Sequence, residues 1–116
     1  MMDAKGFVAI VRRIVCDGAV RATVRNLEQP PGRRPPRDLV LRSDWYRDLD
    51  EHHKRMVMET IRTSVENAIF DLFCVLDGVR VIEDTWEKGA FELRFLKGEA
   101  EEVISPSGEY LHELFR

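Results

Sequence analysis

The stretch that decides the fold is LDEHHKRMVMETIRTSVENAIFDLFCVLDG, residues 49–78. Its apolar residues recur at helical spacing and Gly78 supplies a C-terminal stop, so the sequence predicts one long helix. Ser43, followed by Asp44, has the chemistry of a helix N-cap, and we expect helical structure to start there. In residues 68–76, apolar side chains point in almost every direction around the axis. Because a helix that is apolar all round must be buried all round, we expect this half at the centre of the molecule.

The residues before this helix predict two short helices and an exposed connector. Two stripes at helical spacing lie there: Phe7, Ile10, Val11 and Ile14, then Val20, Val24 and Leu27. The stripes are out of phase, so a break at Asp17–Gly18, with Asp17 capping the second helix, lets each helix bury its own face. The proline-rich residues 30–37 then end the helical pattern, because proline lacks the backbone donor.

The residues after the long helix change from helical to alternating periodicity. Residues 91–95 alternate apolar and polar side chains, residues 97–99 read as a turn, and residues 101–104 supply a second strand, which together predict a β-hairpin. Residues 79–83 predict a third strand, and residues 109–115 a short closing helix. The predicted fold is therefore α+β, with N-terminal helices and a long buried central helix packed against a C-terminal antiparallel hairpin or small sheet.

Composition favours one globular domain over residues 1–116. The chain has 116 residues, 44% hydrophobic and 34% charged, with a net charge of −3 that is unevenly spread. Residues 1–42 carry +5 and residues 43–116 carry −8. The N-terminal apolar stretch is too short for a signal peptide, and no apolar run approaches the roughly 20 residues that cross a bilayer. We therefore expect a cytoplasmic protein with no membrane association, in which Cys16 and Cys74 are buried, reduced thiols.

A metal site is one alternative for the polar face of the long helix. Asp48, His52 and Glu59 share one face of this helix, and carboxylates and imidazole together can bind a divalent metal. A metal bound at these three residues would make the protein a metal-dependent enzyme or regulator. The same face also carries Arg55, Arg62 and Glu66. Such spacing is typical of a salt-bridged solvent face, with Glu59 paired to arginine.

No nucleophile–base pair stands out in the sequence. His53 lies on the apolar stripe of the long helix, so we interpret it as a partly buried core residue. Ser64 lacks the glycine context of a nucleophile elbow, and apolar neighbours surround Cys74. The sequence predicts a protein that is not an enzyme and needs no cofactor, and leaves any role of His52 or His53 open.

An acidic surface is the candidate for binding a partner. The proposed contact residues are Trp86, Glu87, Glu92, Glu101 and Glu102. Carboxylates around an aromatic anchor favour a basic protein as the partner. The connector residues Arg33, Arg34 and Arg37 could bind phosphates. However, no aromatic residues alternate with these arginines, and the chain as a whole is acidic, with a pI near 5.6. A nucleic-acid partner is therefore disfavoured.

Two further stretches carry a resemblance: IFDLFCVLDGV, residues 69–79, and GEYLHELF, residues 108–115. They are similar to small stand-alone bacterial proteins of uncharacterised function, some of which resemble immunity proteins of contact-dependent or polymorphic toxin systems. The resemblance implies a cytoplasmic binding protein without cofactor or catalytic residues. The leading hypothesis is a non-catalytic protein-binding module of this kind. Homo-oligomerisation through the apolar N-terminal helices is compatible with it.

Overall fold

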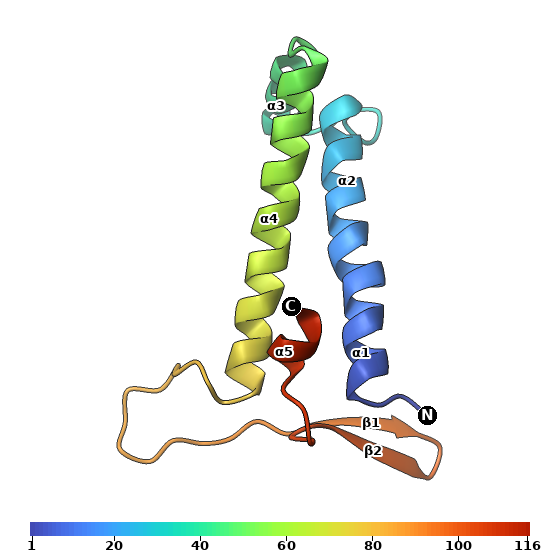
Figure 1. The fold of residues 1–116 in the computed structure, drawn as a ribbon. Helices are drawn as coiled ribbons and strands as arrows, with labels where there is room; N and C mark the ends of the chain where they lie inside the picture. The colour runs from blue at the N-terminus through green and yellow to red at the C-terminus, as the bar shows by residue number, and fades with distance from the viewer. The chain divides into compact units, whose positions relative to one another are not determined.

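Helices make up most of the chain, and a two-stranded antiparallel sheet precedes the last, short helix (Figure 1). The computed structural model describes all residues from 1 to 116. The elements in chain order are α1 (Ala4–Ile10), the π-helical η1 (Val11–Cys16), α2 (Asp17–Glu28), α3 (Arg37–Arg47), α4 (Glu51–Leu76), β1 (Leu93–Lys97), β2 (Ala100–Ser105) and α5 (Leu111–Phe115). This architecture confirms the predicted α+β class.

The chain divides into two compact units. The terminal unit combines residues 1–15 with residues 67–116, and the middle unit consists of residues 16–66. The terminal unit therefore holds α1, the end of α4, the hairpin and α5, while the middle unit holds α2, α3 and the first part of α4.

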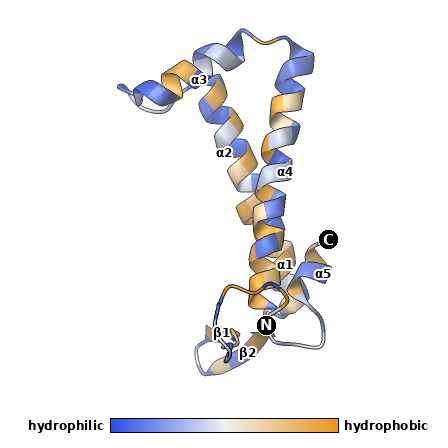
Figure 2. Cartoon of the chain, turned by 90° about the vertical axis from the view of Figure 1, so that its left-hand side faces the viewer, coloured by the Kyte–Doolittle hydropathy of each residue, from blue (hydrophilic) through white to orange (hydrophobic).

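The predicted break in the N-terminal helical region is wrong. Helical structure continues from α1 through η1 into α2, and η1 changes the helical phase between them. Ala4 and Val8 are buried in the terminal unit, whereas Cys16 and Val20 are buried in the middle unit. Ile10 and Ile14 of the first stripe are exposed, whereas Val20 of the second stripe is buried in the middle unit, so the two stripes need not be in phase within one continuous helical segment. Figure 2 shows the mostly hydrophobic character of α1.

Asp17 does not cap α2, contrary to the prediction. The chain is already helical at Cys16, which occupies the N-cap position but does not cap the helix with its side chain. The Asp17 carboxylate instead accepts a hydrogen bond from Arg62 Nη1 at 2.9 Å. Asp17 thus joins α2 to α4 within the middle unit.

The predicted helix start at Ser43 is also wrong. α3 begins at Arg37, directly after Pro36, so the connector predicted at 30–37 ends one residue earlier. Ser43 lies in the middle of α3 with no exposed surface, and its Oγ donates to the Leu27 carbonyl at 2.7 Å. This serine is a packing contact between α3 and α2. Tyr46, one turn further along α3, is also buried, and burial raises the pKa of its hydroxyl.

The long helix is confirmed, but its predicted complete burial is wrong. α4 ends at Leu76, and Gly78 adopts a φ of +78°, a conformation that glycine accepts without a steric penalty. Phe73 is buried, whereas Leu72 beside it is 50% exposed and Asp71 is exposed. The core of the terminal unit covers one face of α4, and the opposite face meets solvent.

Aromatic rings join the helices of the terminal unit. The Phe73 ring lies edge-on to Phe7 of α1, with 6.1 Å between centroids, and to Phe115 of α5, with 5.4 Å. The Arg12 guanidinium lies 4.1 Å from the centroid of the Phe115 ring and donates to the Phe115 carbonyl. Contacts of this geometry hold α1, α4 and α5 together beyond simple burial.

The hairpin and the closing helix follow the prediction. β1 and β2 pair antiparallel, with Lys97 opposite Ala100 and Gly98 at a φ of +60° in the turn. A two-stranded sheet is marginal alone, and β2 packs on α1, burying Ile104. The closing helix buries Leu111 and Phe115. The predicted third strand at residues 79–83 is absent, because no strand of the chain pairs with it.

Candidate protein-binding site

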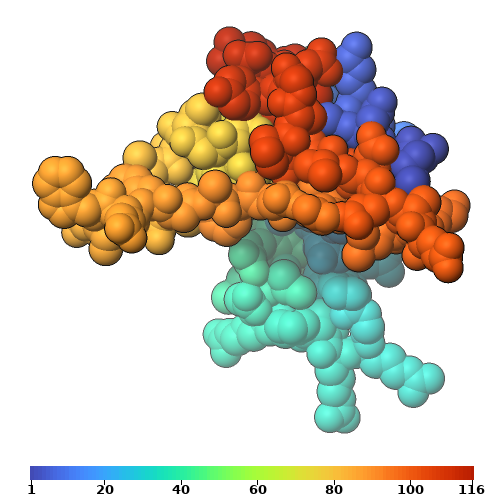
Figure 3. All heavy atoms as spheres, turned by 90° about the horizontal axis from the view of Figure 1, so that it is seen from below, coloured from blue at the N-terminus to red at the C-terminus, as the bar shows by residue number.

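The chain from Val79 to Phe91, called here the connecting segment, links α4 to β1 without helix or strand. The amides of Val79 and Arg80 donate to the Cys74 carbonyl at 3.0 and 3.2 Å and thereby close the end of α4. Residues 81–91 make no backbone–backbone hydrogen bond. In Figure 3 this orange segment extends sideways beyond α5, which is red. Apart from the carbonyls of Thr85 and Glu87 and the amide of Gly89, which bond to side chains of the segment, the backbone polar groups of residues 81–91 are available to a partner.

Large apolar side chains of the connecting segment face solvent. They are Val79, Val81, Ile82, Trp86 and Phe91. Trp86 is as exposed as in an extended chain, at 103%. Single exposed apolar residues are common on proteins, but five within thirteen residues favour an interaction surface.

A hydrogen-bonded turn holds Trp86 in this outward position. Its three bonds run from Thr85 Oγ1 to Glu87 O (2.8 Å), from Lys88 Nζ to Thr85 O (2.6 Å) and from Gly89 N to Glu83 Oε2 (2.7 Å). Two of these bonds involve Thr85, the residue directly before Trp86. The indole is therefore presented at the apex of a locally organised turn.

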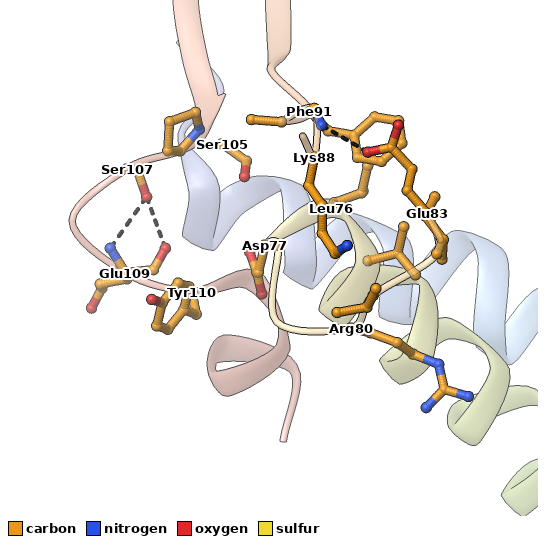
Figure 4. Close-up of a pocket in the computed structure, with 17 residues that line it drawn as sticks. Leu76, Asp77, Arg80, Glu83, Lys88, Phe91, Ser105, Ser107, Glu109 and Tyr110 are labelled. Carbon is orange, nitrogen blue, oxygen red and sulfur yellow. Dashed lines mark hydrogen bonds between the residues drawn. The ribbon is translucent and has the colours of Figure 1, made fainter. Parts of the chain in front are cut away.

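A pocket of about 560 Å³ lies beside the connecting segment (Figure 4). It is bounded by the end of α4, by the connecting segment and by residues 105–110. Its apolar lining includes Leu76, Val81, Ile82, Phe91, Pro106 and Tyr110. In Figure 4 the Lys88 side chain points toward Leu76 and Asp77, whereas the Arg80 guanidinium points away from the other labelled residues. The pocket thus combines apolar walls with charged residues of both signs, because Asp77, Glu83 and Glu109 line it as well as Arg80 and Lys88, and the Lys88 ammonium donates to the Thr85 carbonyl.

The five predicted partner-binding residues fall into two groups. Trp86 and Glu87 are exposed side by side on the connecting segment. Glu92 and Glu101 both form ion pairs with Arg94 of β1, and Glu102 is half-buried on β2. Arg94 partly neutralises the charge of Glu92 and Glu101. The hairpin therefore attracts a basic partner less strongly than its number of carboxylates indicates.

The three residues of the predicted metal site do not lie on one helix. Asp48 is the C-cap residue of α3, whereas His52 and Glu59 belong to α4, which begins at Glu51. The predicted common face therefore does not form. The structure contains no group of three or more histidine, cysteine, aspartate or glutamate side chains arranged to hold a metal ion.

His53 is exposed, which corrects its predicted place in the core. Its side chain is 62% exposed, and its Nδ1 lies 2.7 Å from Asp50 Oδ1. The same carboxylate accepts the backbone N–H of His53 at 2.8 Å, which caps the first turn of α4. This backbone bond, followed by the bond from the ring, lowers the pKa of Asp50. The sequence predicted that Glu59 pairs with an arginine. In the structure, Arg62 instead contacts Asp17 and, at 3.9 Å, Glu66.

A carboxylate–histidine pair that the sequence did not single out joins Asp77 to α5. The Asp77 side chain, 2% exposed, accepts the backbone N–H groups of Leu111 (3.0 Å) and His112 (2.9 Å). It also lies 2.6 Å from His112 Nδ1, and the Tyr110 ring stacks on the His112 ring at 5.3 Å. Every one of these bonds serves to fix the start of α5.

A signal for this contact exists in the sequence. Tyr110 stands at the N-cap position of α5 and supplies no side-chain acceptor. The first amides of a helix need acceptors, so a helix without a local cap requires one from elsewhere in the chain. Asp77 lies more than thirty residues earlier, and only the fold brings it there.

The two cysteines are buried thiols, as predicted. Burial, followed by the carboxylates of Asp71 and Asp77, raises the pKa of the Cys74 thiol. A thiol in such surroundings is a poor nucleophile, since only the thiolate reacts. Cys74 is accordingly a packing residue of α4.

The basic connector remains exposed around Arg33 and Arg34, and Arg37 opens α3. None of the helices is both long enough and apolar enough to cross a bilayer.

No family model, no curated protein and no solved structure matches this chain.

Proposed function

We propose that this chain is a non-catalytic protein-binding module of the immunity type, which binds a basic protein through the connecting segment. The observation that carries the proposal is the complete exposure of Trp86 at the apex of a hydrogen-bonded turn. An exposed indole is unfavourable in water, whereas tryptophan is among the residues that contribute most to binding energy when an interface buries it. A preorganised turn also lowers the ordering cost of binding.

The charges near Trp86 support a basic partner. The connecting segment carries three carboxylates against two cations, and Asp84, Glu87 and Lys88 lie within two residues of Trp86. Carboxylates at the rim of an interface raise the rate of association with a basic protein. The expected complex has the indole at its centre and these carboxylates around it.

The immunity-type assignment rests on the resemblance of residues 69–79 and 108–115. A cytoplasmic location accompanies it, since the buried thiols of Cys16 and Cys74 would stay reduced there. The proposed mechanism is occlusion: the bound module covers a basic surface that the partner needs for its activity. It requires no cofactor.

The proposal is tested with a matched pair of variants, Trp86→Ala and Trp45→Ala. Trp45 is also exposed, at 54%, but it lies on α3 in the middle unit. The wild-type chain and Trp45→Ala should capture the same basic protein from the native host. Trp86→Ala should bind the purified protein about 30-fold more weakly by calorimetry, as expected for loss of an interface hot spot.

Two results would count against the proposal. Equal affinity of wild type and Trp86→Ala would show that the connecting segment is not the binding surface. A captured protein that does not impair growth when it is expressed without this chain would remove the immunity-type assignment.

A further inference from the structure

We propose that residues 30–37, the basic connector and the first residue of α3, bind a small ligand that carries a chain of phosphate groups, through the guanidinium groups of Arg33, Arg34 and Arg37. The inference goes beyond the proposed function and stands without it. The connector belongs to the middle unit, whereas the proposed protein-binding surface belongs to the terminal unit.

The three arginines have no carboxylate partner. Arg33, Arg34 and Arg37 are exposed, and their guanidinium groups form no hydrogen bond or ion pair within the chain. Three other arginines of the middle unit, by contrast, are each paired with a carboxylate: Arg42 with Asp38, Arg47 with Asp44 and Arg62 with Asp17. Asp38 directly follows Arg37 in the sequence, but its carboxylate is engaged by Arg42 at 2.8 Å. All donors of the three guanidinium groups are therefore free to bind a ligand.

Free backbone donors lie beside these side chains. The amides of Gly32, Arg33 and Arg34 donate to no acceptor of the chain. Gly32 has a φ of +83°, a left-handed conformation that glycine adopts without a steric penalty. Successive amides at a turn of the backbone can form a concavity that binds anions. Residues 32–34 offer hydrogen-bond donors from both backbone and side chains, so a ligand rich in acceptors suits them.

Prolines restrict the connector before any ligand binds. Four of the seven residues 30–36 are prolines, whose φ is fixed, and in Figure 1 the connector is the cyan loop between α2 and α3. A restricted loop loses less conformational entropy on binding than a flexible one. The planar guanidinium fork also matches the geometry of phosphate oxygens and binds them through two parallel hydrogen bonds.

The charge of the remaining chain favours a short anion over a long one. Residues 30–37 carry three arginines and no carboxylate, so their charge is +3, and the other residues carry −3 − 3 = −6. A nucleic acid would extend beyond the connector toward this acidic remainder, and residues 30–37 contain no aromatic side chain on which a base could stack. A short polyphosphate contacts the connector alone. Because the arginines span five residues, several linked phosphate groups suit them better than a single one.

Calorimetric titration of the full chain with sodium tripolyphosphate tests the inference. Wild type should bind it, and the triple variant Arg33→Gln/Arg34→Gln/Arg37→Gln should bind at least about 100-fold more weakly, because the loss of each charge-assisted contact weakens binding about tenfold. The matched control is Arg42→Gln/Arg47→Gln, which removes arginines of the same unit that already pair with carboxylates and should leave the affinity unchanged. The circular dichroism spectrum of the triple variant should equal that of wild type, since the replaced side chains form no hydrogen bond or ion pair in the chain.

Two further ligands identify the group that is recognised. ATP should bind about as tightly as tripolyphosphate, because the phosphate chain supplies the contacts. Sodium phosphate should bind at least about tenfold more weakly than tripolyphosphate, because a single phosphate group cannot reach all three arginines.

Three outcomes would overturn the inference. Wild-type protein that shows no binding at millimolar tripolyphosphate would exclude the site. Equal affinity of wild type and the triple glutamine variant would place the bound anion elsewhere on the chain. A single-stranded thymidine oligonucleotide that binds more tightly than tripolyphosphate would make a nucleic acid the partner of the connector.

Discussion

Replacement of Asp77 by alanine should destabilise the terminal unit strongly. The Asp77 carboxylate is almost fully buried and accepts hydrogen bonds from the amides of Leu111 and His112 and from the His112 ring. No other side chain caps α5 at its N-terminus. The variant leaves two helix amides and one imidazole N–H without their acceptor.

The magnitude follows from these three bonds. Loss of an N-cap costs about 1–2 kcal/mol, and each hydrogen bond to a charged group contributes about 1.5–3 kcal/mol. The bonds share one carboxylate and water can replace some of them, so their energies do not add fully. We expect the free energy of unfolding to fall by about 3 kcal/mol for Asp77→Ala. Asp77→Asn keeps one acceptor oxygen and should lose about half as much.

Urea unfolding and amide hydrogen exchange measure this prediction. The exchange rates of the Leu111 and His112 amides report the capping bonds directly, and they should rise in Asp77→Ala. The control is Asp71→Ala, which removes an exposed carboxylate of α4, the helix that ends just before Asp77; for it we expect a change within about 0.5 kcal/mol. If Asp77→Ala and Asp71→Ala unfold at the same urea concentration, the assignment of Asp77 as the anchor of α5 is refuted.

Three further predictions concern other parts of the chain. Ser43→Ala should lower the free energy of unfolding by about 1–2 kcal/mol in urea titration, because a buried carbonyl loses its donor, whereas exposed Ser64→Ala should not. Cys74 should resist a thiol reagent at neutral pH until the chain unfolds, since burial raises its pKa; rapid labelling of the folded protein would contradict this. The pKa of Asp50 is lowered from 3.8 by hydrogen bonds from His53, so its stabilising effect is present above the unfolded pKa and is lost as the pH falls through the folded pKa. Asp50→Asn should therefore lose less stability than wild type between about pH 5 and about pH 2 in thermal unfolding, and equal losses would argue against the cap.

The long helix and the hairpin could be predicted because their signals are local. Helical periodicity up to Gly78 located α4, and alternation around the Lys97–Gly98 turn located β1 and β2. Each of these patterns needs only the residues that form the element. The closing helix was found in the same way.

The helix boundary at Ser43 could not be predicted, because the same side chain serves two purposes. A serine caps a helix with its hydroxyl, but it also satisfies a carbonyl across a helix interface, and Ser43 does the latter with Leu27. The choice depends on α2 lying beside α3, which is not a local property. The break expected at Asp17 failed for a related reason, since it assumed that both stripes are buried, whereas Ile10 and Ile14 of the first stripe are exposed.

The candidate site could be predicted only in part. The sequence singled out Trp86 and Glu87 but not the pocket, because its walls come from three separate stretches of chain. It also placed a strand at residues 79–83, where the β-branched residues have strand propensity but no neighbouring strand to pair with. The resulting exposed apolar segment is the feature on which the proposed function depends.

The central claim of the proposed function is that an interface buries Trp86. The most direct test is the fluorescence of Trp86 in the Trp45→Phe chain, where it is the only tryptophan, recorded without and with the basic partner. We predict an emission shift to shorter wavelength and protection from iodide quenching as the complex forms. Emission that stays at the wavelength of a solvated indole, with full quenching in the complex, would contradict the claim.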